Sequence, residues 1–193
     1  MIKELKGSVN NQIPESILQD YLMLKALEKK KSDKYIAIAE LSIHSKIVQS
    51  DLSILNLNYK EANSEMERKF YSRMSATIAF EYFSDVNFLL GNKLTKELRR
   101  NGFDSLAEKA KSLNREFSEF KKTNISLFKL IRNETGAHKT KNTEKLVKSI
   151  FEIDDKKVMD VIADLAIINN KLFALSTEVY RSISEFHKEN GTL

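Results

Sequence analysis

Residues 104–135, DSLAEKAKSLNREFSEFKKTNISLFKLIRNET, carry the most regular hydrophobic pattern in this chain. The apolar positions alternate steps of four and three residues and include one polar member, which is typical of a helix that packs along a seam. The pattern predicts one long helix that ends near Thr135-Gly136, where a glycine can cap it. The expected seam is Leu106, Ala110, Leu113, Phe117, Phe120, Asn124, Leu127 and Ile131.

A second seam with the same alternation lies in the C-terminal part of the chain. A short helix is predicted before it, at about Thr143 to Phe151, and Asp154 or Asp155 is expected to cap the long helix that follows. Two long seamed helices joined by a compact connection are expected to pack antiparallel. The second seam is Val158, Ile162, Leu165, Asn169, Leu172, Ser176, Val179, Ile183 and Phe186.

The region from Lys60 to Arg100 is predicted to be one long helix that stops at Asn101-Gly102. Asp104 can then cap the helix that follows. Apolar residues recur at every fourth position through this region, which indicates a ridge along one face of the helix. The predicted ridge is Met66, Phe70, Met74, Ile78, Tyr82, Val86 and Leu90.

The N-terminal part of the chain is also predicted to be helical. Pro14 suits a first helical turn, because its missing N–H would have no helical partner there, and this helix should end at Lys29-Lys30-Lys31. The segment from Ser32 to Asn58 alternates in places as a strand would and elsewhere suits a helix. Helix is preferred because no second strand is available for pairing. We therefore predict an N-terminal helical segment, residues 1–58, packed on a helical bundle formed by residues 59–193.

The composition favours an all-α fold, an antiparallel helical bundle with long helices. One proline and five glycines among 193 residues are too few turn formers for many short strands. The absence of cysteine excludes disulfides, thiolate chemistry and cysteine-ligated zinc. The chain has no run of about 18 uncharged apolar residues and no secretory segment at its start, so a cytoplasmic protein without a membrane partner is predicted. The net charge of +5 favours polyanions only mildly.

Three histidines are the first candidates for chemistry. His44 and His187 have no neighbours that suggest a site, and both are interpreted as surface residues. No His-x3-His or His-Glu pair suggests a metal, and no glycine-rich loop follows a strand, so neither a metal nor a cofactor is predicted. His138 differs because it closely follows Arg132 and Asn133 at the end of a long helix.

The spacing of Arg132 and His138 can bring a cation and an imidazole together. On an unbroken helix these residues would lie about 120° apart, but a left-handed cap at Gly136 could swing His138 back toward Arg132. Lys139 and Lys141 would then lie nearby. Histidine can move a proton near neutral pH, and arginine can hold a phosphate and stabilise charge that grows on it, without a metal.

A structural alternative stands beside this interpretation. Arg132 could pair with a carboxylate at a helix end, while His138 caps the last carbonyls as a cation. Glu81 and Asp85, one turn apart on an aromatic-rich helix, could reach a cation or Arg132. They are interpreted instead as an exposed acidic face and are left outside the predicted site.

The apolar helix that runs into Arg132-Asn133, with His138 beyond it and then a basic loop and another long helix, resembles the HEPN (higher eukaryotes and prokaryotes nucleotide-binding) superfamily. The compatible region is about Lys60 to Lys188. The resemblance implies an antiparallel helical bundle that dimerises with the two motifs facing each other. Many members are metal-independent endoribonucleases of toxin–antitoxin, abortive-infection and phage-defence systems, whereas others are inactive binding modules.

Three functions follow from these observations. In the first, the protein is a metal-independent endoribonuclease in which Arg132 holds phosphate, His138 is the general acid or base, Asn133 orients one of them, and Lys139 and Lys141 bind RNA. In the second, it is an inactive module that binds a nucleotide or a protein partner, such as a cognate antitoxin or nucleotidyltransferase. In the third, it is a helical scaffold. No basic and aromatic platform for base stacking surrounds the motif, so weak sequence specificity is expected.

Overall fold

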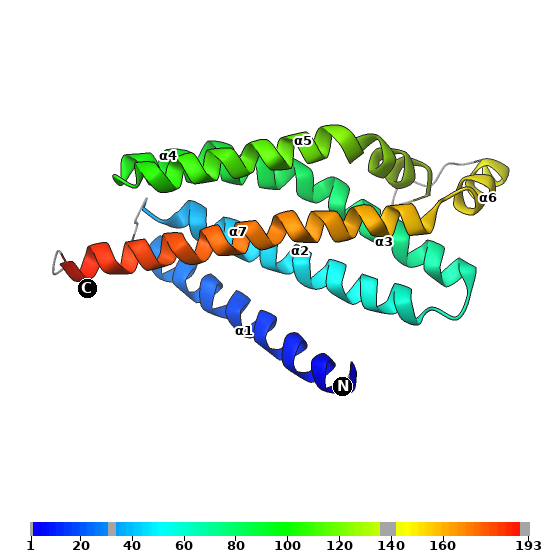
Figure 1. The fold of residues 1–193 in the computed structure, drawn as a ribbon, viewed down its shortest axis with the longest axis horizontal. Coiled ribbons are helices and arrows are strands. Elements are labelled where there is room, and N and C mark those ends of the chain that lie inside the picture. Colours follow the sequence, from blue (N-terminus) through cyan, green and yellow to red (C-terminus); the bar gives the residue numbers. More distant parts are fainter. Residues whose placement is uncertain (1, 31–33, 136–141, 190–193) are drawn as a thin grey trace. The chain divides into compact units, whose positions relative to one another are not determined.

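The computed structural model describes residues 2–30, 34–135 and 142–189, and these ranges form a packed bundle of long helices with no strand (Figure 1). The all-α prediction is confirmed. No helix in the described ranges has both the length and the apolar character that crossing a bilayer requires. The elements are α1 (Ile2–Lys29), α2 (Ile36–Glu61), α3 (Glu65–Asn87), the π-helical segment η1 (Phe88–Leu94), α4 (Thr95–Arg100), α5 (Asp104–Thr135), α6 (Thr143–Phe151) and α7 (Asp155–Glu189).

Two compact units make up the chain. Unit 1 comprises Met1–Ile47, Val86–Arg115 and Asn169–Leu193, and unit 2 comprises Val48–Asp85 and Glu116–Ile168. Helices α2, α3, α5 and α7 each contribute a segment to both units. The division at residue 58 therefore stays a prediction, and the two units are described separately.

The N-terminal helix begins much earlier than the sequence pattern indicated. Helix α1 starts at Ile2, so the prediction that Pro14 occupies a first turn is wrong. A proline inside a helix removes one backbone hydrogen bond and disturbs the preceding turn, but it does not by itself require the helix to start there. The predicted C-terminal end is close to the observed one, since α1 ends at Lys29 and the Lys30 N–H still donates to the Ala26 carbonyl.

The ambiguous segment forms helix α2, as preferred. Its buried positions alternate steps of three and four residues, which is the period of a packed helix. The strand-like alternation arose because small alanines at 37 and 39 are also buried against the neighbouring helices. The buried seam of α2 is Ile38, Leu41, Ser45, Val48 and Leu52.

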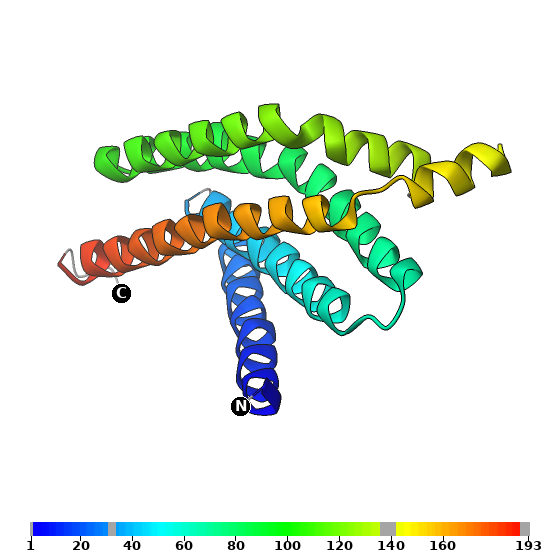
Figure 2. The same ribbon diagram turned by 45° about the vertical axis from the view of Figure 1, so that its right-hand side comes forward.

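A helix break at residues 62–64 contradicts the prediction of a single helix from Lys60 to Arg100 (Figure 2). Ser64 and Glu67 form a reciprocal capping box at the start of α3. The Glu67 N–H donates to Ser64 Oγ at 3.2 Å, and Glu67 Oε2 accepts from the Ser64 N–H at 3.1 Å and the Asn63 N–H at 2.7 Å. This Ser-x-x-Glu pattern stands in the sequence and could have predicted the break.

The ridge predicted for α3 is wrong over its first half. Met66, Phe70 and Met74 are exposed, whereas Tyr82 and Val86 are buried. A step of four residues advances about 40° around a helix, so a strict four-residue row leaves the buried face within a few turns. The observed seam instead alternates steps of three and four as far as Leu90, and its first two members are polar. It consists of Lys69, Ser72, Ala76, Ala79, Phe83, Val86, Leu90 and Leu94.

The seams predicted for the other long helices are largely confirmed. On α5, Leu106, Ala110, Leu113, Phe117 and Ile131 are buried, while the remaining three members are half-buried. On α7, the first seven predicted positions are buried, Ile183 is half-buried and Phe186 is exposed. Inside unit 1, Asn169 Nδ2 of the α7 seam donates to the Ser45 carbonyl oxygen of α2 at 3.3 Å.

The choice of Asp154 or Asp155 as the cap of α7 is resolved, and α6 is capped as well. Helix α6 spans Thr143–Phe151 as predicted, and the Lys145 N–H donates to the Asn142 side chain at 3.0 Å. Asp154 caps α7, because its Oδ1 accepts from the Lys157 N–H at 3.0 Å. Asp155 lies in the first turn instead and accepts a hydrogen bond from the Tyr59 hydroxyl at 2.9 Å.

The stop predicted at Asn101-Gly102 is confirmed as a Schellman cap at the end of α4. Gly102 has φ +83°, the Gly102 N–H donates to the Arg99 carbonyl at 3.1 Å, and the Phe103 N–H donates to the Leu98 carbonyl at 2.9 Å. Helix α5 begins directly at Asp104, so this residue lies in the first turn rather than before it.

Gly102→Ala is expected to lower the free energy of unfolding by about 1–2 kcal/mol, because a Cβ is disfavoured in the left-handed region. No steric clash contributes, since a Cβ built at this position would meet nothing within 4 Å. Gly102→Asn is the matched control and should cost less, because asparagine tolerates this conformation. Urea unfolding of both variants measures the difference, and equal stability of Gly102→Ala and the wild type would contradict the expectation.

Candidate functional site

Arg132, in the last turns of α5, lies against α3 within unit 2. Its Nε donates to Glu81 Oε1 at 3.0 Å, and its Nη2 lies 2.9 Å from the same oxygen. The Nη1 nitrogen donates to Asn133 Oδ1 at 3.4 Å. The Arg132 side chain is 25% exposed, and one edge of its guanidinium is occupied by Glu81.

An aromatic ring supports the same guanidinium. The central carbon of the Arg132 guanidinium lies 5.1 Å from the centroid of the Phe80 ring, a cation–π contact. Phe80 and Glu81 are consecutive on α3, so one turn of that helix holds the arginine by stacking and by charge. A short side chain at either position would leave the guanidinium less well oriented.

Glu81 therefore belongs to the candidate site, although it was predicted to lie outside it. Glu81 was interpreted as part of an exposed face, and its side chain is indeed 56% exposed. It is also the ion-pair partner of Arg132. The signal that could have placed it in the site was its position on the aromatic-rich helix, from which it was expected to be able to reach Arg132.

The other predicted site residues divide into two groups. Asn133 is exposed and contacts Arg132 through its side-chain oxygen. His138, Lys139 and Lys141 lie outside the described residues, as does the cap expected at Gly136. The chain is described again from Asn142, which caps α6.

Lys69 is a buried cation that sequence reasoning missed. Its side chain is only 5% exposed, and Nζ donates to the carbonyl oxygens of Phe151 at 3.0 Å and Ile153 at 2.7 Å. These carbonyls lie at the C-terminal end of α6 and in the connection to α7, where a cation is favoured by the helix dipole. Glu65, one turn earlier on α3, lies 3.3 Å from Nζ.

Helix α3 thus holds the chain on both sides of residues 136–141. Arg132 ties the end of α5 to α3 through Glu81, and Lys69 ties the α6–α7 connection to α3. A cavity of about 240 Å³ lies between these two anchored segments. It is lined by Leu127, Leu130 and Ile131 of α5 and by Ser149, Ile153 and Lys157 of the later segment.

The remaining histidines are less exposed than predicted. His44 and His187 are both half-buried. The His187 ring makes an edge-to-face contact with Tyr35, with ring centroids 5.7 Å apart, and a second one with Phe186. His187 is therefore part of the packing at the end of α7. Across the described ranges, no group of three histidine, aspartate or glutamate side chains is arranged to hold a metal ion.

Comparisons of this chain with protein-family models, with curated proteins and with solved structures find no match.

Proposed function

We propose that this protein is a metal-independent endoribonuclease of the HEPN type that acts in the cytoplasm. The observation that carries the proposal is the arginine at the end of α5, which is partly exposed and oriented from two sides by Glu81 and Phe80. It precedes by a few residues a histidine and two lysines in the sequence. A fixed guanidinium next to a titratable imidazole is the minimum that metal-free phosphodiester cleavage needs.

The ion pair with Glu81 leaves Arg132 able to hold a phosphate. A guanidinium carries five N–H donors. Glu81 occupies the Nε side of the group, and Asn133 takes one hydrogen of Nη1. One hydrogen on each terminal nitrogen remains, and these two donors can bind phosphate oxygens.

In the proposed reaction, His138 removes the proton of a ribose 2′-hydroxyl, and the 2′-oxygen attacks the adjacent phosphorus. The bond from phosphorus to the 5′-oxygen breaks, and that oxygen receives a proton as it leaves. The products are a 2′,3′-cyclic phosphate and a 5′-hydroxyl. Arg132 stabilises the negative charge that grows on the phosphate oxygens. RNA should therefore be cut in the presence of EDTA, whereas DNA, which lacks the attacking hydroxyl, should remain intact.

An antiparallel HEPN-like bundle is part of this proposal. Helix α5 runs from unit 1 into unit 2, whereas α7 runs from unit 2 into unit 1, which supports opposite directions for these two helices. A cognate antitoxin or nucleotidyltransferase is the kind of protein partner that a toxin of this type would require.

A homodimer is expected, with the two Arg132–His138 clusters near the twofold axis. One arginine and one histidine make a sparse catalytic site, and a twofold interface lets the same surface supply both sets of groups. Multi-angle light scattering at micromolar concentration should give twice the mass of the chain. A monomer at that concentration would contradict the shared-site arrangement and weaken the nuclease proposal.

The second candidate is an inactive module of the same fold that binds a nucleotide or a protein partner. The observation in its favour is the charge of Glu81, which offsets that of Arg132 and would repel a phosphate approaching from the same side. This candidate predicts a well-folded protein that cuts no RNA. The cleavage assay in EDTA therefore separates the two functions directly.

A further inference from the structure

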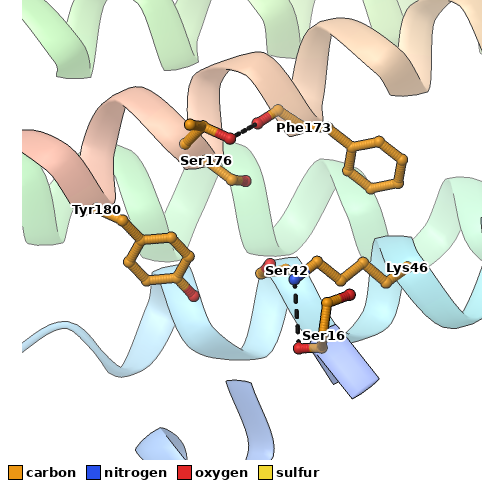
Figure 3. Close-up of a pocket in the computed structure, with 7 residues that line it drawn as sticks. Ser16, Ser42, Lys46, Phe173, Ser176 and Tyr180 are labelled. Atoms are coloured by element: carbon orange, nitrogen blue, oxygen red, sulfur yellow. Dashed lines mark hydrogen bonds between the residues drawn. The ribbon is translucent and has the colours of Figure 1, made fainter. Parts of the chain in front are cut away.

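A cavity of about 210 Å³ lies within unit 1, between α1, α2 and α7 (Figure 3). It is large enough for several water molecules or for one compact organic molecule. Its walls carry side chains of three helices: Ser16, Ser42, Lys46, Phe173, Ser176 and Tyr180. Figure 3 shows the Phe173 and Tyr180 rings extending from α7 toward α2.

One wall of the cavity is a charged network that neutralises itself. Asp20 Oδ2 accepts hydrogen bonds from Lys46 Nζ and from Ser42 Oγ, both at 2.6 Å. Lys46 Nζ also lies 3.4 Å from the Ser16 carbonyl oxygen. Asp20 is buried, so it fixes the ammonium group at the edge of the cavity and offsets its charge. An ammonium has three N–H donors, and these contacts engage two of them.

The opposite wall carries two buried hydroxyl groups, those of Ser176 and Tyr180. Ser176 is only 5% exposed and lines the cavity, and its Oγ makes no hydrogen bond among the described residues. The Tyr180 hydroxyl lies near the Ser42 hydroxyl, which already donates to Asp20. Burial raises the pKa of the Tyr180 phenol and the nearby Asp20 carboxylate raises it further, against an opposite effect of Ser42, so this hydroxyl keeps its proton at neutral pH. Buried polar groups in proteins are normally paired, so the unpaired Ser176 hydroxyl that faces this cavity calls for a partner inside it.

We propose that this cavity binds an uncharged, planar aromatic compound that carries a carbonyl group and an N–H group side by side on one edge, as an aromatic carboxamide or a nucleobase does. The Ser176 and Tyr180 hydroxyls can each donate to the carbonyl or accept from the N–H, and Lys46 can supply a further donor. The Phe173 ring offers an aromatic face to the body of the ligand. An ionised ligand is disfavoured, because the Asp20–Lys46 pair leaves no net charge to compensate it.

The test uses three compounds of similar size: benzamide, benzoate and toluene. Binding to the full chain is measured by ligand-observed NMR and by titration calorimetry. Benzamide is expected to bind saturably, whereas benzoate, which carries a charge, and toluene, which lacks the polar edge, should each bind at least about tenfold more weakly. Adenosine extends the series to a nucleobase with a sugar attached.

Variants of the two hydroxyl residues assign the binding to this cavity. Ser176→Ala and Tyr180→Phe should each weaken benzamide binding about five- to tenfold, the effect of one hydrogen bond. Ser184→Ala on the exposed side of α7 and Tyr21→Phe on α1 are the matched controls and should leave the affinity unchanged. Because the Ser176 hydroxyl has no partner among the described residues, Ser176→Ala should melt at least as high as the wild type.

Three outcomes would overturn the proposal. The first is no saturable binding of benzamide or adenosine up to about 10 mM, which would mean that the cavity holds water only. The second is equal affinity for benzamide and benzoate. The third is unchanged affinity in the well-folded Ser176→Ala variant, which decides the matter even if Tyr180→Phe proves unstable.

Discussion

His138→Ala is expected to slow RNA cleavage by about 10²–10⁴-fold, which is the usual contribution of a general acid or base. Arg132→Lys should lose about 10²–10³-fold, although the charge is kept, because a lysine ammonium can reproduce neither the planar arrangement of donors nor the stack on Phe80. The measurement is the initial rate of cleavage of an RNA oligonucleotide in EDTA, together with identification of the 2′,3′-cyclic phosphate end. The same oligonucleotide made of DNA is the substrate control.

Lys122→Ala is a suitable control variant, because it removes an exposed cation from the same helix as Arg132. It should cut RNA nearly as fast as the wild type. Thermal unfolding of all three variants is measured alongside. If the His138 and Arg132 variants cut as well as the wild type, or if both unfold, the motif is structural and the scaffold function is the better account. If wild type and variants stay folded and none cuts RNA, the inactive module is favoured.

Lys69→Met is expected to lower the free energy of unfolding by about 2–4 kcal/mol. Methionine fills similar space but cannot donate, so the Phe151 and Ile153 carbonyls would lose a charged donor while remaining packed against α3. Each hydrogen bond from a charged group is worth about 1.5–3 kcal/mol, and the loss is only partly offset by burying an apolar side chain. Urea unfolding followed by circular dichroism gives the value.

Lys148→Met on α6 is the matched control for this substitution. The Lys148 side chain is highly exposed and lies 3.8 Å from Glu152, so its loss should change the free energy of unfolding by less than about 0.5 kcal/mol. A similarly small effect of Lys69→Met would mean that water can replace the ammonium at the two carbonyls. The anchoring role of Lys69 beside the candidate site would then be wrong.

The helices with regular apolar seams could be predicted closely from sequence, and those with polar seam positions could not. The seams of α5 and α7 are mostly apolar, so their period is recognisable in the sequence, and the approximate bounds predicted for α6 agree with the observed ones. The seam of α3 begins with two buried polar residues, Lys69 and Ser72. A pattern of apolar residues therefore pointed to Met66, Phe70 and Met74, which are exposed. Burial of a lysine is set by carbonyls more than 80 residues away, which no local pattern contains.

The candidate site was predictable in part for the same reason. Arg132 and Asn133 are neighbours in sequence, and their contact follows from one helix end. Glu81, the ion-pair partner of Arg132 on α3, is 51 residues away in the sequence. Which residues of α3 reach Arg132 depends on how α3 and α5 are rotated about their axes where they pack. In the packing between these helices, the ring centroids of Phe83 and Phe128 are 5.9 Å apart and those of Tyr82 and Phe117 are 6.1 Å apart.

The hydrogen bond from the Asn169 side chain to the Ser45 carbonyl gives α7 a single permitted alignment along α2. Leucines and isoleucines in a three–four repeat pack almost equally well after a slide of one heptad, so apolar contacts alone leave the axial position of a long helix poorly defined. A slide of seven residues would carry the Asn169 amide away from this carbonyl and into an apolar layer, at a cost of about 1–3 kcal/mol. Sliding of α7 along α2 is therefore energetically unfavourable. Any rearrangement of unit 1 is expected to keep the axial alignment of these two helices.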